Sequence, residues 1–196
     1  VESMGGDTWE WDGDDWRLGQ PPGPIEETDP FTGAPLYGCT LAYDPAIGRV
    51  LRGCGSELAS WDGASWIVDP SRIVPPLTDG YSLAFDQSRD RLVLAGGCFP
   101  EEYAQCAPFD ETWEWDHTRW RWADPPSVPE ARRGHRLAYD GVRREVVMFG
   151  GKPLREGTWV WDGARWSLKT PVTAPPRRAG HAMAFDPDRG VVLMYG

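Results

Sequence analysis

Several common features are missing or scarce in this sequence. It contains no asparagine, so it carries no N-glycosylation site. No apolar run approaches the roughly 20 residues that a membrane-spanning helix needs, so we expect no membrane insertion. Only Lys152 and Lys169 are lysines among the 20 basic residues, a bias typical of a GC-rich bacterial genome. The first residue is Val1, which is expected if a signal peptide has been removed or if the chain is a fragment.

The charge balance and the composition further limit the fold classes and the partners that this protein can have. The 30 acidic residues outnumber the 20 basic ones, giving a net charge of −10. Phosphate backbones and anionic lipid surfaces repel such a chain, which argues against nucleic acid as a partner. The 23 glycines and 19 prolines exclude a helical bundle, because both residues are costly inside helices. The 12 tryptophans and 40% hydrophobic residues nevertheless predict a folded core.

Internal repeats predict the fold. A Trp-Asp hairpin with a second Trp five residues after the first begins at Trp11, Trp61, Trp115 and Trp161. A segment Gly-x-x-Leu/Met-Ala-Tyr/Phe-Asp ends at Asp44, Asp86, Asp140 and Asp186. Ten residues later a glycine pair follows at Gly96-Gly97 and Gly150-Gly151, and Cys54-Gly55 replaces it once. Units of roughly 50 residues with this periodicity indicate blades of a β-propeller.

Each unit is predicted to form two hairpins. In one unit, residues 137–139 pair with 145–149, and residues 158–161 pair with 165–168 around an Asp-Gly turn. Proline-rich stretches separate the units and stop strand pairing there. The fold class is therefore all-β, with four-stranded antiparallel blades.

The glycine pair followed by Thr-Trp-x-Trp-Asp-Gly-x-x-Trp resembles the kelch repeat in its bacterial form. The resemblance covers nearly the whole chain, implies a propeller, and says little about function. We expect one domain, residues 1–196, with blade pieces 37–70, 80–124 and 134–169. Residues 1–19 would form a fourth blade with 180–196 if the terminal strands pair and close the ring. Kelch proteins usually have six or seven blades, so a segment of a larger propeller is the alternative.

The cysteine positions predict two disulfides. Asp44 should face Arg49 across a hairpin turn, and the same register places Cys39 opposite Cys54. Cys98 and Cys106 share one loop and are close enough in sequence to close it. Free buried thiols or a metal site are the alternatives, although the spacing is not that of a zinc site. Two disulfides indicate an oxidising compartment, so we expect a secreted, cell-surface or periplasmic protein.

Two sets of residues are candidates for ligand binding. Arg132, His135, Arg178 and His181 hold matching positions in two units, and Tyr81 holds the position of the histidines in a third. They would surround one mouth of the channel, where they would contact an anion, a carbohydrate or a metal. In the structural alternative, each aromatic ring covers the glycine opposite it in its own hairpin, and each arginine binds carbonyl groups. The second set is Glu101, Glu102 and Tyr103 in the long loop 97–112, whose alternative is a tolerated insertion.

Recognisable catalytic motifs are missing. The sequence has no Gly-x-Ser-x-Gly, no phosphate-binding glycine loop and no His-Glu-x-x-His. Paired carboxylates at Glu101 and Glu102, or at Asp14 and Asp15, leave a hydrolase or lyase as one hypothesis. The acidic run 12–15 suggests calcium, although aspartate also caps turns of this kind. The tryptophans are expected to fill the space between blades, with Trp122 as the exception.

Three functional hypotheses follow. The first is a non-catalytic extracellular module that binds a protein or a glycan through the loop face of the propeller, without a cofactor. The second is a structural component or fragment of a larger propeller, which would self-associate if its ring is incomplete. The third is the carboxylate-dependent enzyme.

Overall fold

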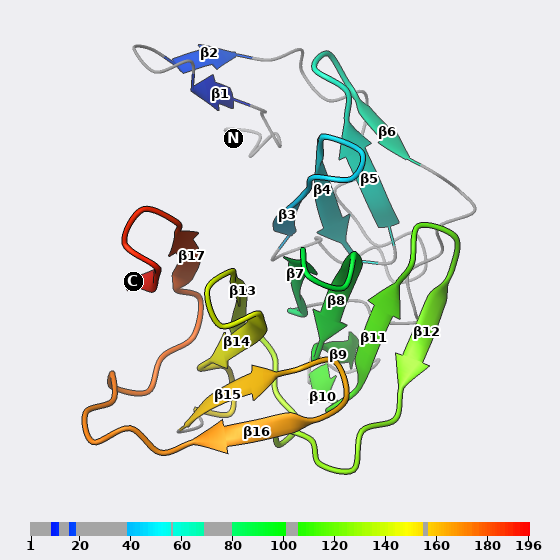
Figure 1. The fold of residues 1–196 in the computed structure, drawn as a ribbon. Helices are drawn as coiled ribbons and strands as arrows, with labels where there is room; N and C mark the ends of the chain where they lie inside the picture. The colour runs from blue at the N-terminus through cyan, green and yellow to red at the C-terminus, as the bar shows by residue number, and fades with distance from the viewer. Residues whose placement is uncertain are drawn as a thin grey trace, which may run out of the picture.

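The structure, a computed structural model, describes residues 9–11, 16–18, 39–55, 57–68, 80–100, 106–154 and 157–196. Every regular element in this part of the chain is a β-strand, as predicted for an all-β protein. No helix there is long and apolar enough to cross a membrane. The strands form antiparallel sheets that are arranged like the blades of a propeller (Figure 1).

Three sheets have four strands each, and we call them blades 1, 2 and 3. Blade 1 has the order β3 (Thr40–Asp44), β4 (Arg49–Cys54), β5 (Glu57–Trp61) and β6 (Trp66–Val68). Blade 2 has the order β7 (Ser82–Asp86), β8 (Arg91–Ala95), β11 (Thr112–Trp115) and β12 (Trp120–Ala123). Blade 3 has the order β13 (Arg136–Asp140), β14 (Glu145–Phe149), β15 (Thr158–Trp161) and β16 (Trp166–Lys169).

Three further pairs of strands remain two-stranded. They are the N-terminal hairpin of β1 (Trp9–Trp11) and β2 (Trp16–Leu18), the inserted hairpin of β9 (Cys98–Pro100) and β10 (Cys106–Pro108), and the C-terminal hairpin of β17 (Ala182–Asp186) and β18 (Val191–Tyr195). Ring closure would require β18 to pair with β1. In this structure those strands belong to separate sheets, and the two hairpins stand apart (Figure 1). The four-bladed ring therefore stays a prediction.

The tight turn after the first strand of each blade depends on the aspartate that ends that strand. The Asp140 Oδ1 accepts hydrogen bonds from the backbone N–H groups of Val142 and Arg143, both at 3.0 Å. Asp44 and Asp86 cap their turns in the same way. The fourth residue after the aspartate takes a left-handed conformation, with φ of 65° at Gly48, 55° at Asp90, 57° at Arg144 and 62° at Gly190. A repeated sequence motif thus fixes a repeated turn.

The core lies between neighbouring blades, because each blade buries one face against the next. The face of blade 1 that carries Ala42, Leu51 and Leu58 packs against the face of blade 2 that carries Leu83 and Phe85. We call the face that a blade turns toward the next blade in the sequence its back face, and the face that it turns toward the preceding blade its front face. The same arrangement joins blades 2 and 3, with Ala84, Val93 and Ala95 on the back face, and Leu137, Val146, Met148, Trp161 and Trp166 on the front face. Each buried large side chain contributes about 1.5–3 kcal/mol.

Candidate functional site

The predicted channel-mouth residues lie where the first strands of the blades begin. Strands β3, β7, β13 and β17 follow one another side by side (Figure 1). Just before these strands, the Gly134 N–H donates to the Gly80 carbonyl at 2.7 Å, and the Gly180 N–H donates to the Gly134 carbonyl at 3.0 Å. A chain of backbone hydrogen bonds therefore links consecutive blades at this mouth.

Both histidines are packed between blades. A Cβ built on Gly96 would lie 2.6 Å from the His135 Cε1, and one built on Gly150 would lie 2.7 Å from the His181 Cε1. The ring therefore covers the glycine of the preceding blade, and the prediction that it covers the opposite glycine of its own hairpin is wrong. The physical reason is that these side chains leave their own sheet and fill the junction with the neighbouring blade.

The two arginines make the same set of bonds in successive units. The Arg132 Nη1 donates to the Gly150 carbonyl at 3.2 Å, and the Arg178 Nη1 donates to the Gly196 carbonyl at 2.6 Å. The backbone carbonyl of each arginine in turn accepts from a glycine N–H of the preceding unit, at 2.9 Å in both cases; the donors are Gly97 and Gly151. The arginines thus bind the glycine pairs of two blades together.

Tyr81 plays the corresponding part between blades 1 and 2. Its hydroxyl donates to the Gly55 carbonyl at 3.1 Å, and its ring lies against Gly53. Tyr81, Arg132, His135 and His181 are only 3%, 2%, 0% and 2% exposed. In this structure they are closed to a ligand and join blades to each other. For the arginines, this agrees with the alternative given in the sequence analysis, in which each arginine binds backbone carbonyl groups.

Burial has a clear electrostatic consequence for the histidines. Loss of hydration, together with the charges of Arg132 and Arg136, lowers the pKa of His135 to about 3. Burial and the charges of Arg136 and Arg178 also lower the pKa of His181. In the part of the chain that the structure describes, no group stands in good hydrogen-bond geometry to a ring nitrogen of either histidine, and only the backbone of Ala95 comes near that of His135. Both histidines are therefore neutral at pH 7 and behave as packing groups.

The loop 97–112 is an anchored hairpin in the structure. Both of its ends are tied to blade 3, because the Gly97 N–H donates to the Arg132 carbonyl at 2.9 Å and the Arg132 N–H donates to the Phe109 carbonyl at 3.3 Å. The Phe109 N–H also donates to the Gly97 carbonyl at 3.0 Å, which closes the base of the hairpin. Glu101, Glu102 and Tyr103, the predicted binding residues of this loop, lie outside the described residues.

A small cavity lies beneath the base of the inserted hairpin, between blades 2 and 3. Its volume is about 10 Å³, room for about one water molecule. The lining includes Thr112, Met148, Arg132 and the segment from Phe109 to Asp110. This volume suits a bridging water and excludes a sugar or a peptide side chain.

The disulfide predictions can be compared with the geometry. Cys39 and Cys54 form a disulfide with a Cα–Cα distance of 4.5 Å, so the first pairing is confirmed. The register behind that prediction is also confirmed, since Thr40 pairs with Gly53 and Asp44 with Arg49. Cys98 is disulfide-bonded as well, whereas the side chain of Cys106, its predicted partner, lies outside the described part.

Aspartates of the Trp-Asp turns cap those turns in the structure. The Asp162 Oδ1 accepts from the N–H groups of Ala164 and Arg165, both at 2.9 Å, and the Asp62 and Asp116 carboxylates do the same in their units. The acidic run 12–15, for which calcium was considered, lies outside the described residues. Among the described residues there is no group of three or more His, Cys, Asp or Glu side chains that could hold a metal ion.

The tryptophans divide between the core and the surface. Trp115, Trp161 and Trp166 are buried between blades, as predicted. Trp122 is 57% exposed on the outer strand of blade 2, as expected for the tryptophan that was predicted to lie outside the core. It pairs across the sheet with Trp113.

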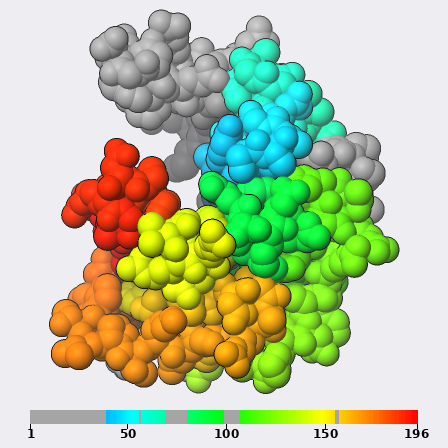
Figure 2. All heavy atoms as spheres, viewed as in Figure 1, coloured from blue at the N-terminus to red at the C-terminus, as the bar shows by residue number. Residues whose placement is uncertain are grey.

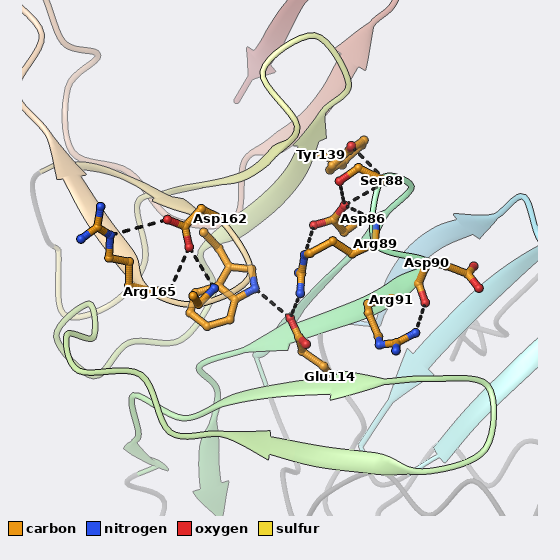
Figure 3. A network of polar contacts seen from close by, with 11 residues as sticks. Asp86, Ser88, Arg89, Asp90, Arg91, Glu114, Tyr139, Asp162 and Arg165 are labelled. Atoms are coloured by element: carbon orange, nitrogen blue, oxygen red, sulfur yellow. Dashed lines mark hydrogen bonds and ion pairs between the residues drawn. The ribbon is translucent and has the colours of Figure 1, made fainter.

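An ion-pair network between blades 2 and 3 was missed by the sequence analysis. Arg89 donates from Nε to Asp86 at 2.7 Å and from Nη1 to Glu114 at 2.6 Å (Figure 3). The same Glu114 oxygen accepts from the Trp161 indole N–H of blade 3 at 2.9 Å. The Arg89 side chain also lies against Gly163, where a Cβ would approach within 2.6 Å. The available signal was the tetrapeptide Thr-Trp-Glu-Trp, which occurs at 112–115 and again at 8–11.

His117 is a second residue that sequence analysis missed. It stands at a position where the other units have glycine, and it keeps a positive φ of 67°. Its Nε2 lies 3.0 Å from the Asp90 carboxylate, and its Nδ1 lies 3.5 Å from the buried Asp44 carboxylate of blade 1. Histidine in a turn position that holds glycine in the other units was the sequence signal for this contact between blades 1 and 2.

Comparisons with known proteins support the fold alone. No family model matches the sequence, and no curated protein matches it either. A solved structure entitled "Structure of YjhT" is similar, with a TM-score of 0.58, 13% sequence identity and 96% of this chain covered. The chain spans 65% of the length of that structure. At this identity the likeness carries the propeller architecture and no activity.

Proposed function

We propose that this chain is a non-catalytic kelch-type module that binds a protein or a glycan with the loop face of its propeller, outside the bacterial cytoplasm. The inserted hairpin is the observation that carries this proposal. It occurs in blade 2, between β8 and β11, whereas the described residues between β4 and β5 and between β14 and β15 form no such strand pair. The described base of this hairpin is bonded to the segment that leads into blade 3, and binding loops commonly stand on a rigid scaffold of this kind.

The sequence between β9 and β10 suggests the class of partner. Residues 101–103 are Glu-Glu-Tyr, and the whole chain carries a net charge of −10. This favours a neutral glycan or a basic protein surface over a polyanion. The Cys39–Cys54 disulfide supports an oxidising compartment.

Binding assays with a tip variant test the proposal. Wild-type protein and the triple variant Glu101→Gln, Glu102→Gln, Tyr103→Ala are applied to a glycan array and to a panel of bacterial surface proteins. We expect the variant to lose at least tenfold in affinity for any ligand of the wild type. Asp188→Asn, in the β17–β18 turn, is the control and should bind normally. Equal binding by the triple variant would remove the hairpin tip from the site.

A second candidate is a structural part of a larger propeller. It is favoured by the C-terminal hairpin, which remains two-stranded, and by the 65% coverage of the similar structure. Light scattering tests this role, because a stable monomer of 21.9 kDa would contradict it.

A further inference from the structure

The outer strand of blade 2 carries an exposed tryptophan where the other blades have an aliphatic residue. Trp122, on β12, is 57% exposed, and no other large hydrophobic side chain in the described residues of blade 2 is exposed. The corresponding residues are Val68 in blade 1 and Leu168 in blade 3, since each lies two residues beyond the paired tryptophans of its Trp-Asp turn. The segment around β12, light green in Figure 2, lies at the periphery of the molecule.

A carboxylate accompanies this indole on the same face of the sheet. Trp122 lies directly opposite Trp113, which packs on the core between blades 1 and 2, so both belong to the front face of blade 2. The Trp113 indole N–H donates to the Glu111 Oε2 at 2.9 Å. Because residues two apart in a strand share a face, Glu111 and Trp122 are diagonal neighbours, about 7–8 Å apart. The Gly96 N–H donates to the Glu111 carbonyl at 3.0 Å, so the pairing of β8 with β11 continues to this residue.

Blade 3 shows why the indole of blade 2 is exposed. Gly157 holds the position of Glu111 there, because each precedes the threonine that begins its strand. A Cβ built on Gly157 would lie 2.6 Å from the Leu168 Cδ1, so the leucine folds over this glycine. In blade 2 the glutamate side chain fills that space. The larger Trp122 therefore cannot lie where the leucine lies in blade 3.

The exposed indole with a carboxylate beside it occurs in blade 2 alone among the three four-stranded blades. Blade 1 has Glu57 at the position of the glutamate, but Ala59 and Val68 replace the two tryptophans. Blade 3 keeps the first tryptophan and lacks both the glutamate and the exposed indole. Since these blades form the same sheet without it, the combination is not needed for the fold.

This combination of groups is suited to a neutral sugar. The C–H face of a sugar ring is apolar and packs on the flat face of an indole, whereas the hydroxyl groups of the ring donate to a carboxylate. A sugar ring on Trp122 has its hydroxyl groups within reach of Glu111, because the two side chains are diagonal neighbours. A protein surface fits less well, since protein hot spots cluster in apolar patches and this ring is isolated. Glu111 and the net charge of −10 disfavour an acidic sugar.

We propose that Trp122 and Glu111 form a subsite for one neutral hexose unit of a glycan, with the sugar ring on the indole and its hydroxyl groups donating to the carboxylate. The subsite rests on the proposed binding function and specifies a neutral sugar as its ligand. It adjoins the base of the inserted hairpin, because Glu111 follows the segment from Phe109 to Asp110 that closes this base. The subsite thus extends the surface proposed for that hairpin.

Nuclear magnetic resonance of the isotope-labelled full chain tests the subsite with simple probes. The probes are the methyl glycosides of glucose, galactose and mannose, with glucuronate as the acidic counterpart. The variant Trp122→Leu assigns the Trp122 indole N–H signal, because that signal disappears. We expect at least one neutral glycoside to shift this signal in a saturable way, and glucuronate to bind about fivefold more weakly.

Two variants separate recognition from folding. Trp122→Leu gives blade 2 the residue of blade 3 and should weaken binding of the neutral glycoside by about tenfold, whereas the matched control Leu168→Ala should bind like the wild type. Glu111→Gln keeps an acceptor for the Trp113 indole and removes the charge. We expect it to bind the neutral glycoside about three- to tenfold more weakly and to discriminate less against glucuronate. Unchanged affinity and discrimination in Glu111→Gln would overturn the role of the carboxylate.

The failure of the subsite can be distinguished from the failure of the proposed function. Absence of a shift with all three neutral glycosides would overturn the subsite. A glycan that is lost by the variant of residues 101–103 and kept by Trp122→Leu would also overturn the subsite and leave the proposed function standing. A surface protein that requires Trp122, with no shift by any glycoside, would assign the indole to a protein interface instead. A protein without any ligand on the glycan array or in the protein panel would overturn both proposals.

Discussion

His135 makes a strong prediction about the pH dependence of stability. The folded protein holds this imidazole neutral, with a pKa of about 3, whereas the unfolded chain binds a proton near pH 6.5. Below pH 6.5 the unfolded state therefore binds more protons than the folded state. Stability is complete above pH 6.5 and is lost progressively as the pH falls toward 3.

The size of the effect follows from the interval between the two pKa values. Each pH unit below 6.5 costs about 1.4 kcal/mol, so the loss at pH 5 is about 2 kcal/mol. Carboxylates such as Asp140 and Asp162, whose pKa values are also lowered, add a loss of the same sign only at lower pH, as it falls below their unfolded value of 3.8. The window from pH 7.5 to 5 therefore isolates the histidines, to which His181 adds in the same direction.

Urea unfolding followed by tryptophan fluorescence at pH 7.5, 6 and 5 measures this loss. The variant His135→Leu removes the titrating group and should flatten the dependence by about 2 kcal/mol over this range, whatever its stability at pH 7.5. The control Met148→Leu changes a buried residue of the same blade that does not titrate, and it should keep the wild-type slope. Parallel curves for the wild type and His135→Leu would refute the burial of a neutral imidazole in this junction.

Three further predictions concern the contacts between and within blades. Gly150→Ala should destabilise the protein by at least 3 kcal/mol, because its Cβ would lie 2.3 Å from the Arg178 carbonyl oxygen; Gly48→Ala, which also has a positive φ but meets nothing within 4 Å, should cost about 1 kcal/mol in the same denaturation assay. Glu114→Ala should cost about 1–2 kcal/mol by removing the acceptor of Arg89 and Trp161, and Glu114→Gln less, as measured by urea midpoints. Replacing Cys39 and Cys54 by alanine should cost about 3 kcal/mol, because the bridge closes a loop with a sequence separation of 15; an unchanged unfolding midpoint would contradict this.

The strands and their registers could be predicted because the sequence repeats them. A single assumption, that Asp44 faces Arg49, correctly placed Cys39 near Cys54. The turns were predictable for the same reason, since each depends on one local aspartate. Periodicity determines which residues share a face of a sheet, and hairpin pairing is a local property of the chain.

Contacts between blades could not be predicted in the same way. Sequence spacing says which glycine is opposite His135 in its own hairpin, but the ring packs on Gly96 of the preceding blade. The tilt of neighbouring sheets decides that contact, and it has no signature within one unit. The partnership of Glu114 with Trp161 is equally remote in sequence, because the two residues stand 47 positions apart.

Comparison of the repeated units also distinguishes residues that recur for structural reasons from residues at which one unit differs from the others. The arginines make the same hydrogen bonds and the histidines the same packing contacts in each unit where they recur, which identifies their role as joining blades. Blade 2 departs from the others in three respects: the inserted hairpin, His117 in place of a turn glycine, and the exposed Trp122. None of these departures is required by the blade itself, because blades 1 and 3 form without them. Tests of the proposed binding role should therefore begin at blade 2, and substitutions of Arg132, His135 or His181 should affect stability first.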